Sequence, residues 1–177
     1  MTDDPRDATR GGVNPPALPA EPPAGGKIGP LSIDELYQAT IVDHDRAPRN
    51  AGALADPTHQ ATLDNPLCGD TVTLHVRIED GVIRDIAFDA RGCALSRAAA
   101  SIMTTLVRGR TIDASRDLAA AFERFVQAAP DAAVDEPDGC EVLGELRAFA
   151  GVRRFRSRRV CALLGFRALL RALDPAT

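Results

Sequence analysis

The chain has 177 residues, of which 45% are hydrophobic, so it can bury the core of one compact domain. Its 25 acidic and 21 basic residues give a net charge of -4, which offers no positive excess to attract phosphate backbones and argues against a nucleic-acid partner. The N-terminus is acidic and no apolar run approaches about 18 residues, so we expect neither a secretory signal nor a membrane span, and a cytoplasmic location.

Residues 1–30 are rich in proline and glycine and contain almost no large apolar side chain. Such a segment cannot bury enough apolar surface to offset the entropy of folding. We therefore predict a disordered leader over residues 1–30 and one folded domain over residues 31–177. A docking tail for a partner protein is the less favoured interpretation of the leader.

The first regular element is predicted at residues 32–45. Ser32 and Glu35 have the spacing of a capping box, and apolar residues follow at helical intervals. Pro48 disfavours helix in the residue before it, so the helix should end ahead of this proline. His44 falls at the end of the helix, where a lone histidine is more often a surface or capping group than a metal ligand.

An antiparallel sheet is predicted from residue 59 onward. A short strand over residues 59–65 precedes a run at residues 71–78 in which apolar and polar side chains alternate strictly, the pattern of a strand with one buried face. His75 then lies on the solvent face. The turn Glu79-Asp80-Gly81 predicts a hairpin into a further strand over residues 82–90.

Helices are expected over most of the remaining chain. Helical periodicity predicts helices at residues 94–108 and 113–127, a solvated loop at 131–139, a short helix ending at Gly151, and a last helix at residues 161–173. Strands followed by helices indicate an α+β fold, in which helices cover one face of a small antiparallel sheet of about three strands.

The turn at residues 64–70 contains two possible metal ligands, Cys68 and Asp70, held by Pro66 and Gly69 without a helix or strand. Cys93 and Cys161 each stand at the predicted start of a helix, where the partial positive charge of the helix N-terminus lowers a thiol's pKa. In a reducing compartment four cysteines are more often ligands or reactive thiols than disulfides.

Three thiolates and one carboxylate form a set of four ligands, which suits the tetrahedral preference of zinc. A carboxylate binds soft metals more weakly than a fourth thiolate would, so the site would be exchangeable. The same residues could instead hold an iron-sulfur cluster, and a closed zinc site that only stabilises the fold is a further alternative. Cys140 lies outside this pattern and is interpreted as an incidental thiol rather than a fifth ligand.

Several motifs occur together in one order along the chain: Asp43-His44 with Pro48-Arg49-Asn50, then Asn65-Pro66-Leu67-Cys68-Gly69-Asp70, then Gly92-Cys93-Ala94-Leu95-Ser96, and a third cysteine at the last helix. In these motifs the chain resembles the NifU N-terminal/IscU family of iron-sulfur cluster assembly proteins from about residue 31 to residue 173. The resemblance implies that Cys68, Asp70, Cys93 and Cys161 are the metal or cluster ligands, with zinc or an iron-sulfur cluster ([2Fe-2S] or [4Fe-4S]) as cofactor.

Within this family the chain is most similar to the SufU branch. Residues 113–151 look like the SufU insertion, and Val160 stands where IscU proteins carry a histidine ligand. The resemblance implies a scaffold or a zinc-dependent sulfurtransferase, with a SufS-like cysteine desulfurase and downstream iron-sulfur apoproteins or other Suf components as partners. It also makes Cys68 the persulfide acceptor and Arg158, which matches a SufU arginine, a support for a thiolate or the transferred sulfur. SufU proteins usually have lysine at the position of Val160 and proline at that of Arg156, and this chain departs from them there.

Overall fold

The computed structural model describes residues 33–130 and 140–174. The predicted leader at residues 1–30 and the predicted loop at residues 131–139 lie outside the described residues. The elements follow one another in the order α1 (Ile33–Arg46), β1 (His59–Asn65), β2 (Asp70–Glu79), β3 (Val82–Arg91), α2 (Ala94–Val107), α3 (Ile112–Gln127), α4 (Cys140–Leu143), the 3-10 helix η1 (Gly144–Arg154) and α5 (Arg156–Leu173).

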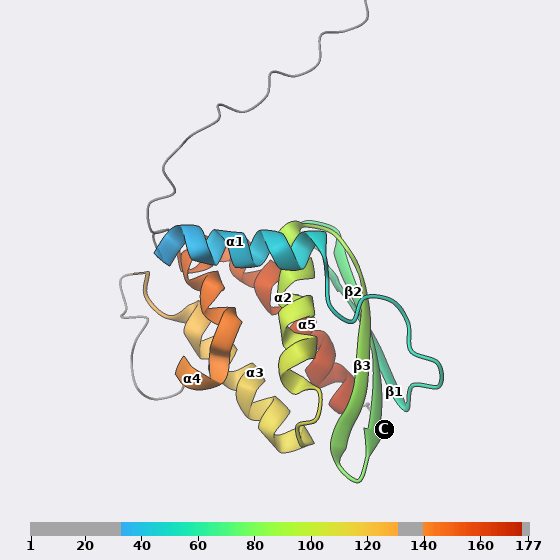
Figure 1. The fold of residues 1–177 in the computed structure, drawn as a ribbon. Helices are drawn as coiled ribbons and strands as arrows, with labels where there is room; N and C mark the ends of the chain where they lie inside the picture. Colours follow the sequence, from blue (N-terminus) through green and yellow to red (C-terminus); the bar gives the residue numbers. More distant parts are fainter. Residues whose placement is uncertain (1–32, 131–139, 175–177) are drawn as a thin grey trace, which may run out of the picture. The chain divides into compact units, whose positions relative to one another are not determined.

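The three strands form one antiparallel sheet in the order β1, β2, β3 (Figure 1). In the middle of the sheet Leu74 pairs with Ala61 on one side and with Phe88 on the other. The alternation in β2 buries Val72, Leu74 and Val76 completely, and α2 and α5 pack on that face. The predicted α+β architecture, with helices on one face of a small antiparallel sheet, is confirmed.

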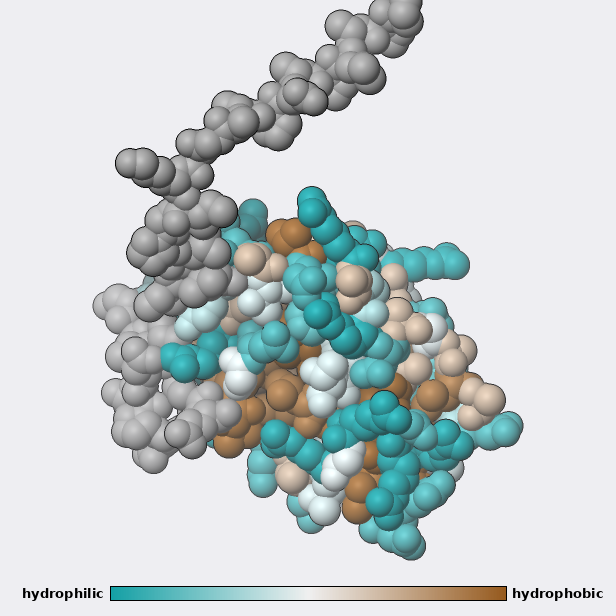
Figure 2. All heavy atoms as spheres, in the orientation of Figure 1, coloured by the Kyte–Doolittle hydropathy of each residue, from teal (hydrophilic) through white to brown (hydrophobic). Residues whose placement is uncertain are grey.

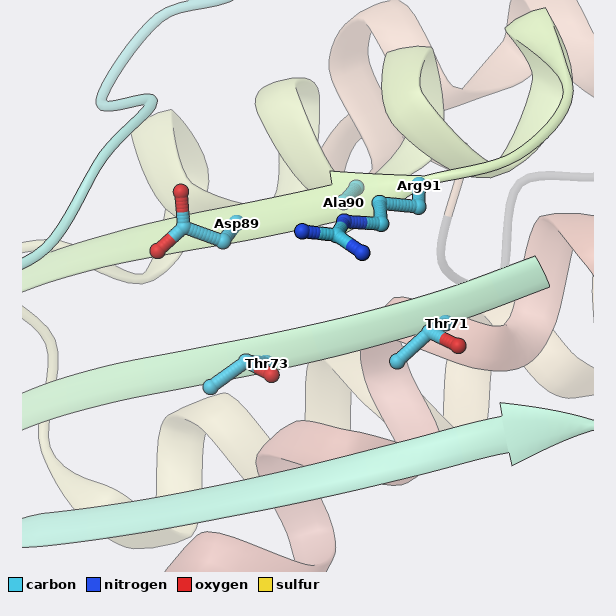
Figure 3. Close-up of a pocket in the computed structure, with 5 residues that line it drawn as sticks. All are labelled: Thr71, Thr73, Asp89, Ala90 and Arg91. Atoms are coloured by element: carbon cyan, nitrogen blue, oxygen red, sulfur yellow. The ribbon is translucent and has the colours of Figure 1, made fainter.

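The opposite face of the sheet is polar. On the side of the molecule that Figure 2 shows, hydrophilic residues are interspersed with hydrophobic ones. His75 lies on this face, as predicted, although its side chain is only 12% exposed and its Nε2 is 3.6 Å from the Asp89 carboxylate. A shallow groove on the same face is lined by Thr71 and Thr73 of β2 and by Asp89, Ala90 and Arg91 of β3 (Figure 3).

Helices α2 and α5 pack closely because Gly165 has no side chain. A Cβ atom at Gly165 would lie 3.2 Å from the Cα of Ala100, so only glycine allows this approach without displacement. Beyond this contact, the rings of Phe122, Phe149 and Phe166 pack together at centroid distances of 4.8 and 5.7 Å from Phe122. The approach at Gly165 sets the separation of α2, whose N-cap is Cys93, from α5, which carries Cys161.

Three sequence expectations need correction. The short helix predicted to end at Gly151 is a four-residue α-helix followed by 3-10 turns that continue to Arg154, and the break falls at Gly144, whose φ is +47°. The last helix begins at Arg156 rather than at Cys161, since the Phe155 carbonyl accepts the backbone N–H groups of Arg158 and Arg159.

The third correction concerns His44, which is 2% exposed and therefore not a surface group. Its Nδ1 lies 2.7 Å from the Ser101 hydroxyl, and its Nε2 lies 3.4 Å from the Glu145 carboxylate. Ser101 lies in α2 and Glu145 in η1. The apolar periodicity of the α1 sequence gives no information about these contacts with distant segments. Among the described residues, no helix is both long and apolar enough to cross a bilayer.

Candidate metal centre

The turn between β1 and β2 is organised by Asn65, whose side chain is 1% exposed. Its backbone carbonyl accepts the N–H groups of Cys68 at 3.3 Å and Gly69 at 2.8 Å, and its side-chain Oδ1 accepts the N–H of Leu67 at 3.1 Å. Gly69 has a φ of +74°, which glycine adopts without steric strain. The turn thus presents the Cys68 thiol at the surface, while Asp70 begins β2.

The turn and helix α5 bring two cysteines together that are far apart in the chain. The Cys68 and Cys161 sulfurs are 3.6 Å apart, and one carboxylate oxygen of Asp70 completes a group whose ligand atoms all lie within 4.8 Å of one another. Two sulfurs on one tetrahedral zinc ion, at about 2.3 Å each, are separated by about 3.8 Å. The observed spacing of the two sulfurs therefore fits a shared metal ion.

Asp70 is held ready as a ligand. Its side chain is 3% exposed, Oδ1 accepts the backbone N–H of Cys93 at 3.1 Å, and Oδ2 is buried with no hydrogen-bond partner among the described residues. Burial alone would raise the pKa of Asp70, but the neighbouring polar groups of Cys93, Ser96 and Cys68 outweigh it and hold the pKa below its usual value. An ionised carboxylate with one free buried oxygen needs a further partner, which a metal ion would supply.

Gly92 makes the approach of Asp70 possible. Its φ is +143°, and a Cβ atom at this position would lie 2.3 Å from both Cγ and Oδ1 of Asp70. Any larger residue would therefore collide with the carboxylate. Glycine is therefore needed at position 92 for two reasons: to adopt the positive φ of the turn and to leave room for the Asp70 carboxylate.

Cys93 is the N-cap residue of α2, as predicted from its position before the helical run. Its thiol lies 3.7 Å from the Ser96 hydroxyl, and that hydroxyl donates to the Cys93 carbonyl at 3.0 Å. Cys93 influences the pKa values of both Asp70 and Cys161, although its sulfur stands outside the tightest group of three ligand atoms. Cys93 is thus placed beside the other three residues as the candidate fourth ligand.

The environment of Cys161 differs from the sequence expectation. Because α5 starts at Arg156, Cys161 lies in the second turn and not at the helix N-terminus. Burial raises the pKa of the Cys161 thiol, and the neighbouring Cys68 and Cys93 raise it further. The prediction that a helix N-terminus lowers this pKa is wrong. The Asn65 side-chain amide donates toward the Cys161 sulfur at 3.6 Å, and the Ser157 carbonyl lies 3.6 Å from the same sulfur.

Three further candidates from the sequence are Arg158, Cys140 and His44. The Arg158 guanidinium lies over the Phe155 ring, 4.8 Å from its centroid, and its role as a thiolate support stays a prediction. Cys140 is the first residue of α4, on an element away from the cluster. His44 has its partners in Ser101 and Glu145 instead of the thiols.

Sequence reasoning missed the two residues that support the ligands most directly, Asn65 and Gly92. Both stand inside the motifs, next to ligand residues, and the pairs Asn65-Pro66 and Gly92-Cys93 are turn signals that could have marked them. The groove on the outer face of the sheet is not part of the site, since Thr71 follows Asp70 in β2 and successive side chains point to opposite faces.

A family model described as the NifU-like N terminal domain matches residues 36–162. The chain belongs to this family. The match contains the whole group formed by Cys68, Asp70, Cys93 and Cys161, and it confirms the resemblance noted from the motifs.

Two individual relatives support the same family assignment. The chain is 33% identical over 138 residues to the zinc-dependent sulfurtransferase SufU of Bacillus subtilis (strain 168), covering 78% of this chain and 89% of that protein. It is 36% identical over 141 residues to the iron-sulfur cluster assembly scaffold protein IscU of Streptococcus pyogenes serotype M1, covering 80% and 84%. Such similar identities do not separate the SufU branch from the IscU branch.

The fold agrees with that of a solved relative. A nitrogen-fixing NifU-like protein (N-terminal) from Brucella abortus superposes with a TM-score of 0.68 at 30% identity, over 82% of this chain and 99% of that one.

Proposed function

We propose that this chain is an iron-sulfur cluster assembly protein of the SufU type, which accepts sulfur from a cysteine desulfurase at a zinc site formed by Cys68, Asp70, Cys93 and Cys161. The observation that carries the proposal is the convergence of Cys68, Asp70 and Cys161 within 4.8 Å while the Cys68 thiol stays exposed. Membership of the NifU-like family supports iron-sulfur cluster assembly as the pathway in which the chain acts. Bound zinc would hold the thiols as thiolates at neutral pH.

The proposal assigns the persulfide to Cys68. Cys161 is buried whereas the Cys68 thiol is exposed, so access favours Cys68 as the nucleophile. The Cys68 thiolate would attack the outer sulfur of the desulfurase persulfide, forming a new S–S bond at Cys68 as the enzyme's own S–S bond breaks. The enzyme cysteine leaves as a thiolate, so one sulfur atom moves and no external oxidant or reductant is needed. Delivery to downstream iron-sulfur apoproteins completes the proposed role.

Two alternatives use the same residues. A scaffold role would place an iron-sulfur cluster on these ligands, and a zinc-stapled binding module would use the metal only for stability. The exposed Cys68 favours a transfer role over the stapled module, because a sulfur acceptor must be reached by the donor whereas a purely structural ligand need not be. The 73% exposure of Leu67 also leaves this side of the site open to a partner.

The decisive experiment measures sulfide release by a SufS-like cysteine desulfurase with cysteine and a reductant. The wild-type chain should accelerate turnover, Cys68→Ala should abolish the acceleration, and Cys140→Ala should retain it as a matched cysteine removal outside the cluster. Zinc in the isolated protein would favour sulfur transfer, and a reddish iron chromophore would favour the scaffold. If the wild-type chain neither accelerates turnover nor holds a reconstituted cluster, both assembly roles are lost.

A further inference from the structure

The C-terminal part of the domain has a charge distribution opposite to that of the whole chain. Residues 146–173 contain eight arginines and no aspartate or glutamate, although the chain carries a net charge of -4. Five of these arginines fall within residues 153–159, at the junction between η1 and α5 and only a few residues before Cys161. Positive charge is therefore concentrated on the segment that leads into Cys161.

Two of these five arginines are structural. Arg153 is 3% exposed, its guanidinium lies 4.0 Å from the centroid of the Phe125 ring, and its Nε donates to the Phe125 carbonyl at 2.8 Å. Arg159 donates from Nε to the Arg153 carbonyl at 3.0 Å. These contacts hold the junction in place, so the exposed side chains around it project from a rigid base.

The other three, Arg154, Arg156 and Arg158, are exposed. Within residues 33–130 and 140–174, none of them forms an ion pair with a carboxylate. Arg158 instead stacks on Phe155, whose own side chain is 49% exposed. We call Arg154, Phe155, Arg156 and Arg158 together the arginine surface.

The residues of the arginine surface are not those that stabilise the N-terminus of a helix. Helix α5 has no acidic residue in its first turn, and its N-cap residue, Phe155, makes no side-chain capping hydrogen bond. Arginines at this end face the partial positive charge of the helix, which acidic residues would neutralise. Sequence choices that oppose local stability commonly serve a function, and here the missing negative charge can come from another molecule.

The segment that carries the arginine surface also contacts the sulfurs. The Ser157 carbonyl, in the first turn of α5, lies 3.6 Å from the Cys161 sulfur, which in turn lies 3.6 Å from the Cys68 sulfur. Leu67, which directly precedes Cys68, is 73% exposed and has the largest exposed fraction among the described large hydrophobic residues. A molecule bound to the arginine surface would therefore contact the same segment that, through Ser157 and Cys161, lies next to Cys68.

We propose that the arginine surface docks a carboxylate-rich surface of the sulfur-donating protein, with Phe155 entering an apolar recess between the acidic groups. This inference rests on the proposed function, because it takes the donor to be the desulfurase. Arginine guanidinium groups pair with carboxylates in bidentate geometry, and a central aromatic residue with charged residues around it is typical of a protein interface. The exposed apolar residues and the acidic remainder of the chain favour a protein over a polyanion.

The test compares Arg156→Glu with Arg171→Glu. Both residues are exposed on α5, but they are 15 positions apart, which is about 22 Å along a helix, so Arg171 is the matched control. Glutamate at position 156 suits the helix N-terminus and should not unfold the chain. Binding of each zinc-loaded protein to the SufS-like desulfurase is measured by calorimetry at two salt concentrations, and sulfide release is measured over a range of chain concentrations.

Arg156→Glu should raise both the dissociation constant and the concentration for half-maximal stimulation by about tenfold, with a weaker salt dependence than wild type. Zinc content and sulfide release at saturation should stay unchanged, and Arg171→Glu should behave as wild type. Equal effects of the two substitutions, or no effect of either, would overturn the docking surface. Binding of a short oligonucleotide at physiological salt that Arg156→Glu abolishes would also overturn it, in favour of a nucleic acid.

The two proposals fail separately. Stimulation that is normal in wild type and in Arg156→Glu would leave the sulfur-transfer function intact and remove the docking surface. Binding that depends on Arg156 without any stimulation of sulfide release would remove the function and leave the docking surface.

Discussion

Replacement of Gly92 by alanine tests how closely the backbone supports the metal centre. The new Cβ atom would lie 2.3 Å from Cγ and 2.3 Å from Oδ1 of Asp70, and 2.7 Å from its Cβ. Asp70 cannot move away freely, because it is 3% exposed and its Oδ1 is bound by the N–H of Cys93. The collision must therefore displace the carboxylate, the backbone, or both.

Two effects contribute to the expected loss of stability. An alanine at a φ of +143° is strained by about 1–3 kcal/mol, and overpacking against a buried side chain adds about 1–3 kcal/mol. We expect Gly92→Ala to lower the free energy of unfolding of the metal-free protein by about 2–6 kcal/mol. Displacement of Asp70 should also weaken zinc binding by about 10–100-fold, as is typical when the support of a ligand is lost.

Gly52 offers a matched control, since its φ is +110° but a Cβ atom there would meet no atom within 4 Å. Gly52→Ala should show the strain alone, about 1–3 kcal/mol, with unchanged zinc affinity. Urea denaturation of the metal-free proteins gives the stabilities, and competition with a chromophoric chelator gives the affinities. If Gly92→Ala matches Gly52→Ala in both measurements, Asp70 is not held in the way described, and the reasoning from its contacts is refuted.

Three further predictions follow from contacts outside the ligand set itself. Asn65→Asp replaces the amide that donates to the Cys161 sulfur with a group that only accepts hydrogen bonds. The sulfur-to-metal charge-transfer bands of the cobalt-substituted protein should therefore shift, and metal affinity should fall by about 10–100-fold. An unchanged spectrum would contradict the contact. Burial, assisted by Arg49, lowers the pKa of His44 below its ordinary value of 6.5, so the unfolded chain binds more protons than the folded chain below that pH. The stability of the metal-free protein should therefore decrease as the pH falls below 6.5, and His44→Gln should flatten this slope in urea titrations. An equal slope in the wild type and the variant would exclude His44 as its source. Gly165→Leu should destabilise the fold by about 1–3 kcal/mol or more, because the new side chain would push α2 away from α5 at Ala100. If the variant unfolds at the same temperature as the wild type, the two helices are not closely packed at this point.

The local elements were predictable because their patterns are local. The strict alternation around Leu74 specifies a strand with one buried face, and the run after Cys93 specifies a helix on the core side of the sheet. The start of α5 was not predictable in the same way. The apolar periodicity begins at Cys161, whereas the first turns of the helix are rich in arginine and are held by the Phe155 carbonyl and the buried Arg153.

The sequence by itself determined which side chains could bind a metal, because thiols and a carboxylate at a turn and near helix starts are a matter of residue type and spacing. Only the tertiary structure decided how each of them behaves. Cys161 meets Asn65 across 96 positions of the chain, and His44 meets Ser101 across 57. Burial and hydrogen bonding set the pKa and accessibility of these groups, and both depend on neighbours from distant segments that no local pattern specifies.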